Sequence, residues 1–259
     1  MPNRLTIRPY LVAMTKLYSD LAYLYDALYQ TFIDYDAEFS LYQSCFSPYQ
    51  ATSILEIGCG SGHLASRFIT AGYRYTGVDV SPQMLALARQ RCPAAQFEQA
   101  DMRTLQLNQQ FDAVLITARS LSYILTNADV LGTFRQLAAH LAQSGTLHFD
   151  FIDATTFIPA LDAAAIVEHR AAVATETYLR RSRYQSNLGT GFTWDWHSEF
   201  FIDQPDGQLQ PIATDDATLR SFLPAEIRLL LQLAGLTVLA ERQQPTYAFD
   251  TWVVSAGKA

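Results

Sequence analysis

Three glycines that directly follow a short apolar strand constrain this 259-residue chain more than any other feature. Residues 54–57 (ILEI) read as a strand that carries a carboxylate near its end, and Gly58, Gly60 and Gly62 come next. Glycine is favoured where the backbone bends sharply and lies close to a ligand. We expect a helix to begin near Ser61, with its unpaired N–H groups and positive dipole end facing that ligand. The stretch therefore predicts a nucleotide-type pocket.

The spacing of the glycines narrows the choice of nucleotide. A dinucleotide fingerprint, G-x-G-x-x-G, needs a third glycine at the position that His63 occupies here. A phosphate-binding P-loop needs a lysine after its last glycine, and no lysine occurs between Lys16 and Lys258. The loop therefore favours a ligand that carries a ribose without phosphates.

Acidic residues follow two later strands at the same expected edge. Residues 75–79 (YTGVD) predict a second strand that ends in Asp79, seventeen positions after Gly62. An acid about 20 residues beyond the loop accepts hydrogen bonds from ribose hydroxyls in nucleotide-binding α/β folds. A third strand over 96–102 ends near Asp101.

The alternation of short apolar strands with helical patterns predicts an α/β fold with a doubly wound, mostly parallel, seven-stranded Rossmann-like sheet. Residues 51–165 and 223–259 are expected to form this core, with helices at 82–91 and 127–141. Alternating aromatic and polar residues over 166–222 predict an antiparallel β insert, placed after the fifth strand and covering a substrate cavity. Leucines at three- and four-residue steps predict N-terminal helices over 1–50. Eight tyrosines lie from Tyr10 to Tyr49, and a rigid ring with one hydroxyl is well suited to closing a pocket, so we expect these helices to form a lid.

The chain resembles a class I S-adenosylmethionine-dependent methyltransferase. The resemblance is carried by ILEIGCGSG, GVDVSPQMLALAR, QADM, FDAVLITARSLSYI and GTLHFDFI, in that order over about residues 50–155. It resumes in LRSFLPAEIRLLLQLAGLTVLAE. The segment after the fourth strand is similar to that of aminosugar N-methyltransferases, although Ala118 and Arg119 depart from their Gly-Asn pattern.

The resemblance implies S-adenosylmethionine as the cofactor and a binding site made of Tyr18, Glu56, Gly58, Gly60, Gly62, Asp79, Val80, Met84, Asp101, Met102, Thr117 and Ala118. In this interpretation Glu56 orders the glycine loop, Asp79 holds the ribose hydroxyls, and Asp101 accepts from the adenine amino group. The carbonyl oxygens of Thr117 and Ala118 face the methionine ammonium. The alternatives are an ordinary strand-end acid for Asp79 or Asp101 and ordinary core packing for Met84.

The resemblance also implies a methyl transfer to a small molecule, with nitrogen favoured and oxygen or carbon left open. A neutral amine needs no strong base, whereas a hydroxyl or carbon acid does. The catalytic candidates are Asp150, His197, Tyr25 and Arg119. Three further arginines, Arg180, Arg181 and Arg183, alternate along one strand of the insert, so that only one side faces a cavity; a solvated face or an anchor for a substrate phosphate or carboxylate are the alternatives.

The composition limits the partners. A net charge of −7 and a pI near 5.1 lack the basic surface that nucleic-acid binding needs. Three scattered cysteines give no disulfide framework, no histidine pair has metal-ligand spacing, and no apolar run could span a bilayer. We expect a cytoplasmic protein without a metal, acting on a small molecule away from nucleic acid and membranes, with a homodimer left open. The rival interpretations are an NAD(P)-dependent oxidoreductase and a non-catalytic cofactor-binding protein.

Overall fold

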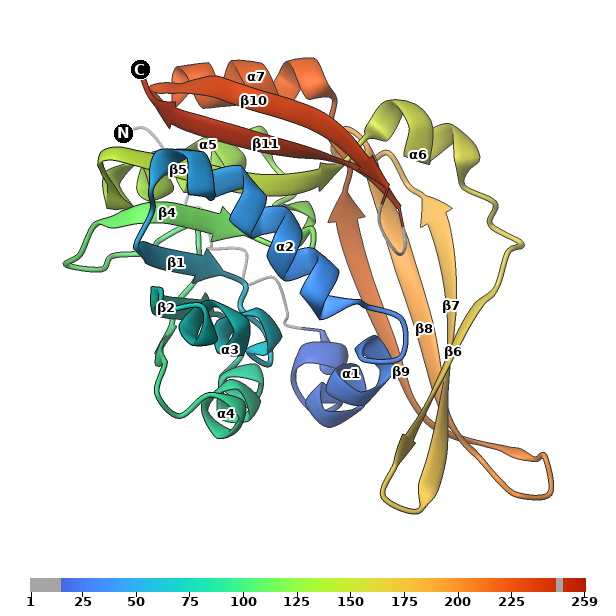
Figure 1. Ribbon diagram of the computed structural model, residues 1–259. Helices are drawn as coiled ribbons and strands as arrows, with labels where there is room; N and C mark the ends of the chain where they lie inside the picture. The colour runs from blue at the N-terminus through green and yellow to red at the C-terminus, as the bar shows by residue number, and fades with distance from the viewer. Residues whose placement is uncertain (1–14, 246–248) are drawn as a thin grey trace, which may run out of the picture.

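The computed structural model describes residues 15–245 and 249–259, which form two β-sheets and the helices around them (Figure 1). The larger sheet has seven strands in the order β10-β11-β5-β4-β1-β2-β3. Its strands are β1 (Ser53–Ile57), β2 (Arg74–Asp79), β3 (Gln96–Gln99), β4 (Phe111–Ile116), β5 (Leu141–Ile152), β10 (Leu236–Pro245) and β11 (Asp250–Lys258).

Most of this sheet is parallel. β1 pairs in parallel with β2 and β4, and the pairs β2–β3 and β4–β5 are parallel as well. Only β11 runs antiparallel to its neighbours β5 and β10. The predicted fold class is confirmed, and the carboxyl ends of β1, β2 and β4 lie side by side, where open α/β sheets bind their ligands.

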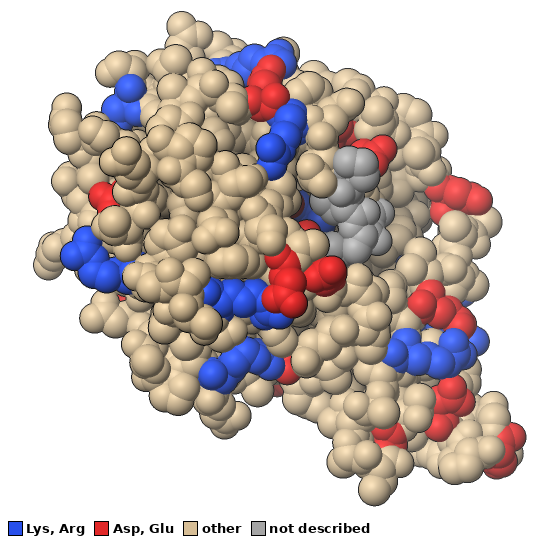
Figure 2. All heavy atoms as spheres, in the orientation of Figure 1, with Lys and Arg blue, Asp and Glu red and all other residues tan. Residues whose placement is uncertain are grey.

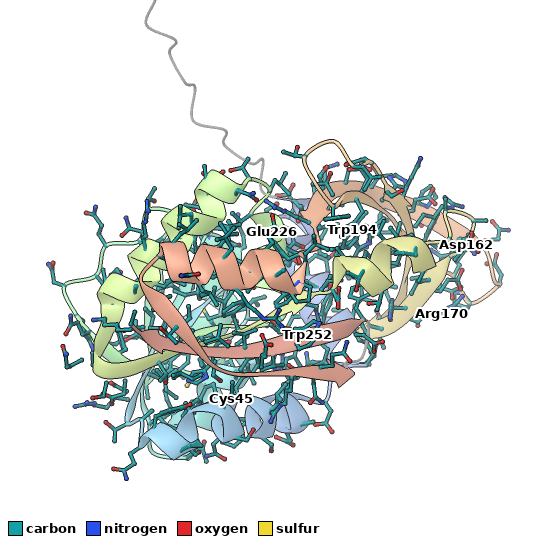
Figure 3. All side chains as sticks on the ribbon, turned by 90° about the horizontal axis from the view of Figure 1, so that it is seen from above. Cys45, Asp162, Arg170, Trp194, Glu226 and Trp252 are labelled. Atoms are coloured by element: carbon teal, nitrogen blue, oxygen red, sulfur yellow. The ribbon has the colours of Figure 1, made fainter. Side chains whose placement is uncertain are left out.

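Helices cover both faces of the seven-stranded sheet (Figure 3). One face packs on α2 (Tyr35–Phe46), α3 (His63–Thr70) and α4 (Pro82–Arg91), and the other on α5 (Asn127–His140) and α7 (Pro224–Leu233). Side-chain caps begin several of these helices: Ser81 accepts a hydrogen bond from the Met84 N–H, with Pro82 in the first turn of α4. The central strand β1 is buried along its whole length.

The predicted antiparallel insert forms a separate four-stranded sheet beside the main one (Figure 1). Its strands are β6 (Val167–Val173), β7 (Glu176–Ser186), β8 (Thr193–Asp203) and β9 (Leu209–Arg220), and α6 (Ala154–Ala160) precedes them. The chain leaves and re-enters the core at one point, because Asp153 and Phe222 form a bridge and the Phe222 N–H donates to the Ile152 carbonyl at 2.9 Å.

The described part of the lid consists of η1 (Lys16–Tyr18), α1 (Ala22–Tyr29), α2 and η2 (Ser47–Tyr49); residues 1–14 of the predicted lid lie outside the described residues. α1 packs between α4 and the inner face of the insert (Figure 1). Asp26 anchors it, accepting hydrogen bonds from Ser61 Oγ at 2.6 Å and from Arg91 Nη2 at 2.8 Å, with His63 Nε2 at 2.9 Å.

One predicted boundary differs from the structure. α3 begins at His63 and not near Ser61, because Gly62 at φ +80° still belongs to the turn before it.

Candidate active site

Two adjoining cavities open at the carboxyl ends of the parallel strands, between the core, the lid and the insert. The first has a volume of about 180 Å³ and the second about 210 Å³. Four residues line both cavities, and we call them the shared wall: Tyr18, Tyr25, Ala118 and Tyr123. Because the same residues line both cavities, molecules bound in the two cavities would lie close together.

The glycine loop forms the floor of the first cavity. Gly58, Gly60 and Gly62 all have positive φ, at 71°, 53° and 80°. A Cβ at Gly58 would collide with the side chain of Ser120, and one at Gly62 would come within 3.0 Å of the Ala88 Cβ. Gly58 and Gly60 line the cavity, whereas Gly62 serves the close packing of α3 on α4 behind it.

Asp79 is held at the wall of the first cavity by backbone donors. Its two carboxylate oxygens accept from the Gly60 N–H at 2.9 Å and from the Ser81 N–H at 2.8 Å. Burial raises the pKa of Asp79, and these N–H groups oppose the rise. The carboxylate is thus fixed in orientation before any ligand arrives.

Glu56 lies buried between β2 and the turn after β4. Its carboxylate accepts from Tyr75 Oη at 2.5 Å and from Thr117 Oγ1 at 2.8 Å, and it is only 2% exposed. It therefore orders β2 and the turn after β4 and makes no hydrogen bond to the glycine loop among the described contacts. Burial raises the pKa of Glu56 to about 7, against the two hydroxyl donors.

Other predicted cofactor residues divide between the cavity and the core. Val80, Asp101 and Met102 line the first cavity, but Met84 is 1% exposed and does not, which agrees with the core alternative. The Asp101 carboxylate is paired with Arg103, whose Nε and Nη2 donate to it at distances down to 2.5 Å. An adenine amino group would have to share an acceptor that already has a partner.

The turn after β4 carries left-handed backbone at two residues, Ala118 (φ 53°) and Arg119 (φ 60°). The Thr117 carbonyl, predicted to face a ligand ammonium, accepts from both the N–H and the Oγ of Ser120. Because these bonds use both lone pairs of that oxygen, the geometry leaves the role to Ala118, which lines both cavities.

The shared wall is built from tyrosine hydroxyls and rings. Tyr18 Oη lies 2.6 Å from Tyr123 Oη, and the Tyr18 ring packs edge-on against Tyr25 with centroids 5.2 Å apart. Ser81 Oγ donates to the Tyr18 carbonyl and so fixes η1 to the start of α4. Burial raises the pKa of Tyr18, Tyr25 and Tyr123, so all three stay protonated at neutral pH.

Two of the catalytic candidates lie away from the shared wall. Asp150 is buried on β5, lines neither cavity, and accepts from the Arg119 N–H at 2.9 Å; burial raises its pKa. His197 lies on the outer face of β8, 2.6 Å from Asp216, and also lines neither cavity. Alternation along β8 turns Trp194 and Trp196 inward and His197 outward. The geometry argues against direct contact of Asp150 or His197 with a substrate, whereas Tyr25 and Arg119 line the second cavity.

Sequence reasoning missed most of the lining of the second cavity, including His169 and Trp196. The only sequence signal for them is the alternation of the strands, since neither belongs to a motif. Arg180 lines this cavity, whereas Arg181 and Arg183 face away and pair with Glu168 and Glu199. Trp194, labelled in Figure 3, closes the end near α6, where its ring packs on Phe157.

Charged side chains form no large patch of one sign on the face drawn in Figure 2. Lys, Arg, Asp and Glu lie there in small groups of both signs. Within residues 15–245 and 249–259, no cluster of three His, Cys, Asp or Glu side chains could hold a metal ion. In the same residues no helix is long and apolar enough to cross a membrane.

Comparisons with known proteins agree with this geometry. Residues 54–145 match the family model described as a methyltransferase domain. A protein of Geobacillus sp. (strain WCH70) that is named as a methyltransferase is 39% identical over 140 residues, which are 51% of this chain and 56% of that one. The dTDP-3-amino-3,6-dideoxy-α-D-glucopyranose N,N-dimethyltransferase of Streptomyces fradiae is 31% identical over 162 residues, 61% of this chain and 59% of the relative.

The whole architecture also has a solved counterpart. The S-adenosylmethionine-bound structure of an amino pentose methyltransferase from Micromonospora echinaspora superposes with a TM-score of 0.73 at 23% identity, covering 90% of this chain and 96% of that one. This likeness concerns the fold alone. The chain spans little more than half the length of the two sequence relatives it matches.

Proposed function

On the premise that residues 54–145 carry a methyltransferase domain, we propose that the protein transfers a methyl group from S-adenosylmethionine to a small molecule. The observation that carries the proposal is the pair of cavities that adjoin at the shared wall. A cofactor in the first cavity and an acceptor in the second would meet there, at the carboxyl edge of the parallel sheet.

The residues of the first cavity fit the proposed cofactor. The loop around Gly58 and Gly60 lets the main chain approach a ligand, and the Asp79 carboxylate suits two ribose hydroxyls. Val80 and Met102 offer apolar contact to a base. Ala118 contributes main-chain atoms for a ligand ammonium. The bound cofactor would supply a methyl group already activated as a sulfonium.

The chain's own contribution is then to position the acceptor and exclude water. Holding a nucleophile in line at near-attack distance is worth up to ~7–11 kcal/mol in well-oriented systems. Tyr18 and Tyr123, whose hydroxyls are 2.6 Å apart, give a rigid wall with a hydrogen-bonding edge. The lid and the insert cover this edge and limit the entry of water.

Nitrogen is the acceptor atom that this site supports best. The tyrosines of the shared wall are held protonated by their raised pKa values, and no Asp or Glu side chain lines the second cavity among its described residues. A neutral amine attacks through its own lone pair and needs no strong base. The N,N-dimethyltransferase of Streptomyces fradiae points the same way. A hydroxyl or carbon acid is the alternative, and His169 is the histidine among the described lining residues of the second cavity.

Titration calorimetry on the full chain tests the cofactor assignment. We expect heat of binding with S-adenosylmethionine and S-adenosylhomocysteine and none with NADH, because the loop lacks the third glycine of the dinucleotide fingerprint. Binding of NADH alone would favour an oxidoreductase and overturn the proposal.

A second experiment tests turnover. The protein is incubated with S-adenosylmethionine and a panel of small amines, and S-adenosylhomocysteine is quantified by mass spectrometry, with Asp79→Ala as the matched control. We expect product with at least one amine and little with the variant. Cofactor binding without turnover on amines, alcohols and carbon acids would favour a non-catalytic cofactor-binding protein.

We also propose that the protein is cytoplasmic and forms a homodimer.

A further inference from the structure

Arg180 is a buried cation at the side of the second cavity. It lies on β7, is 2% exposed, and belongs to the inner face of the insert. Its guanidinium carbon lies 5.2 Å from the ring centroid of Tyr29 and 5.3 Å from that of Trp196. Both distances are within the range of a cation–π contact, so the two rings stabilise the guanidinium at this place in the cavity wall.

Most of these N–H groups have no acceptor. Nη2 lies 3.1 Å from His169 Nδ1, which accepts because burial, and then the charge of Arg180, lower the pKa of His169 to about 4. Nε and Nη1 of Arg180 are buried without a hydrogen-bond partner within residues 15–245 and 249–259. The indole N–H of Trp196 is in the same state. Two neighbouring side chains thus present donors and no acceptor.

The charge of Arg180 also lacks a counterion in the cavity. No Asp or Glu side chain occurs among the described lining residues. Another buried arginine, Arg220, pairs with Glu226 at 2.5 Å. The two arginines on the outer face of β7, Arg181 and Arg183, pair with glutamates as well. A guanidinium that is buried without a counterion is costly, and an anion brought by a ligand removes that cost.

We propose that Arg180 and Trp196 bind an oxyanion of the methyl acceptor, a carboxylate or a phosphate ester. This inference rests on the proposed function and adds the class of acceptor: an anionic molecule with an apolar or aromatic body. Arg180 does not line the first cavity, so the oxyanion lies away from the shared wall and the reacting atom lies toward it. The rings of Tyr184 and Trp194 and the side chain of Leu219 provide the apolar surface between the two ends.

Titration of the full chain with benzoate, benzamide and phenyl phosphate tests the inference. The signal is the ¹⁵N-indole resonance of Trp196, assigned with Trp196→Phe. We expect a saturable shift with benzoate and binding at least about tenfold weaker with the uncharged benzamide, since hydrogen bonds to a charged group are lost. Tighter binding of phenyl phosphate than of benzoate would identify the oxyanion as a phosphate, and the reverse as a carboxylate.

Arg180→Gln should weaken benzoate binding by about tenfold or more, and Arg183→Gln, on the outer face of the same strand, should leave it within about twofold. Equal affinity for benzoate and benzamide in the unmodified protein would overturn the proposal even if Arg180→Gln does not fold. So would unchanged benzoate binding in Arg180→Gln. A titration with S-adenosylhomocysteine on the same samples tests the proposed function separately, because it reports on the first cavity alone.

Discussion

The two cavities are built by different means. The floor of the first is a backbone turn: glycines at positive φ lie beside strand ends and a carboxylate fixed by the N–H groups of Gly60 and Ser81. The second is lined mainly by side chains of the lid and the insert, with aromatic rings around Arg180. The Asp79 carboxylate of the first cavity already has hydrogen-bond donors, whereas Nε and Nη1 of Arg180 and the indole N–H of Trp196 have no acceptor within residues 15–245 and 249–259.

This difference suggests a division of labour. A cavity whose floor is a backbone turn keeps its shape through most substitutions, because the shape changes only if the turn changes. A cavity lined by side chains can bind a different ligand after a single substitution. The following substitutions test whether the first cavity is rigid and whether the second can be changed without an effect on the first.

The largest effect is expected at Glu56, beneath the first cavity. Its pKa is raised to about 7 from an ordinary value of 4.5, so the folded state disfavours the charged form. The contribution of Glu56 to the free energy of unfolding should be highest below about pH 4.5 and fall by up to about 3 kcal/mol as the pH rises from about 4.5 to about 7. Urea unfolding across this range should show a flatter profile for Glu56→Gln. An identical pH profile in the variant would mean that Glu56 does not carry the penalty.

The next effect concerns the fixed carboxylate of the first cavity. Asp79→Ala should weaken S-adenosylhomocysteine binding by about 1–3 kcal/mol, through loss of hydrogen bonds to a buried ribose. Asp101→Ala should cost less, because its carboxylate already pairs with Arg103. Calorimetry on both variants measures the difference. A larger loss of affinity in Asp101→Ala would mean that the principal polar contact with the ligand is made after β3 and not by Asp79 at the end of β2.

A smaller effect is expected at the anchor of the lid. Burial raises the pKa of Asp26, but hydrogen bonds from His63, Ser61 and Arg91 outweigh it and lower the pKa overall. Its contribution is therefore present at neutral pH and lost as the pH falls below about 4. Asp26→Asn should lower the free energy of unfolding by about 1 kcal/mol at pH 7, after solvent screening, and by less in acid. Asp36→Asn, at an exposed ion pair, is the control. An equal loss of unfolding free energy in Asp36→Asn would mean that Asp26 stabilises the fold no more than an exposed ion pair does.

The smallest effect should separate the two cavities. Tyr123→Phe removes one hydroxyl of the 2.6 Å pair with Tyr18 in the shared wall. We expect kcat/KM for the acceptor to fall about fivefold, equivalent to ~1 kcal/mol, with S-adenosylhomocysteine affinity unchanged. Tyr73→Phe, whose hydroxyl bonds Gln43 away from both cavities, should change neither. If Tyr123→Phe weakened both ligands alike, the two cavities would not be separable.

The sequence predicts the first cavity well because its determinants are local. Gly58 and Gly60 follow β1 within a few residues, and Asp79 ends the strand paired with β1. Glu56 shows the limit of this reasoning: its neighbours in sequence suggested the glycine loop, but its partners are Tyr75 of β2 and Thr117, directly after β4.

The second cavity could not be predicted in the same way. The alternation along β7 indicates that Arg180 and Arg181 face opposite sides, but not which side is inner. That choice depends on the packing of the insert against α1, between segments more than 100 residues apart. His169 and Trp196 reach Arg180 only through the register of β6, β7 and β8. His197 was predicted as a catalytic candidate because its residue type suits proton transfer, but its position in the same register points it outward.

The bridge between Asp153 and Phe222 has a consequence for engineering. Because the chain enters and leaves the four-stranded sheet through neighbouring residues of one hydrogen-bonded pair, the whole segment can be exchanged at two adjacent junctions. A chimera that carries the corresponding piece of a relative would keep the glycine turn and the acidic strand ends intact. A new acceptor preference could then be introduced together with the exchanged sheet, without redesigning the residues proposed to bind the methyl donor.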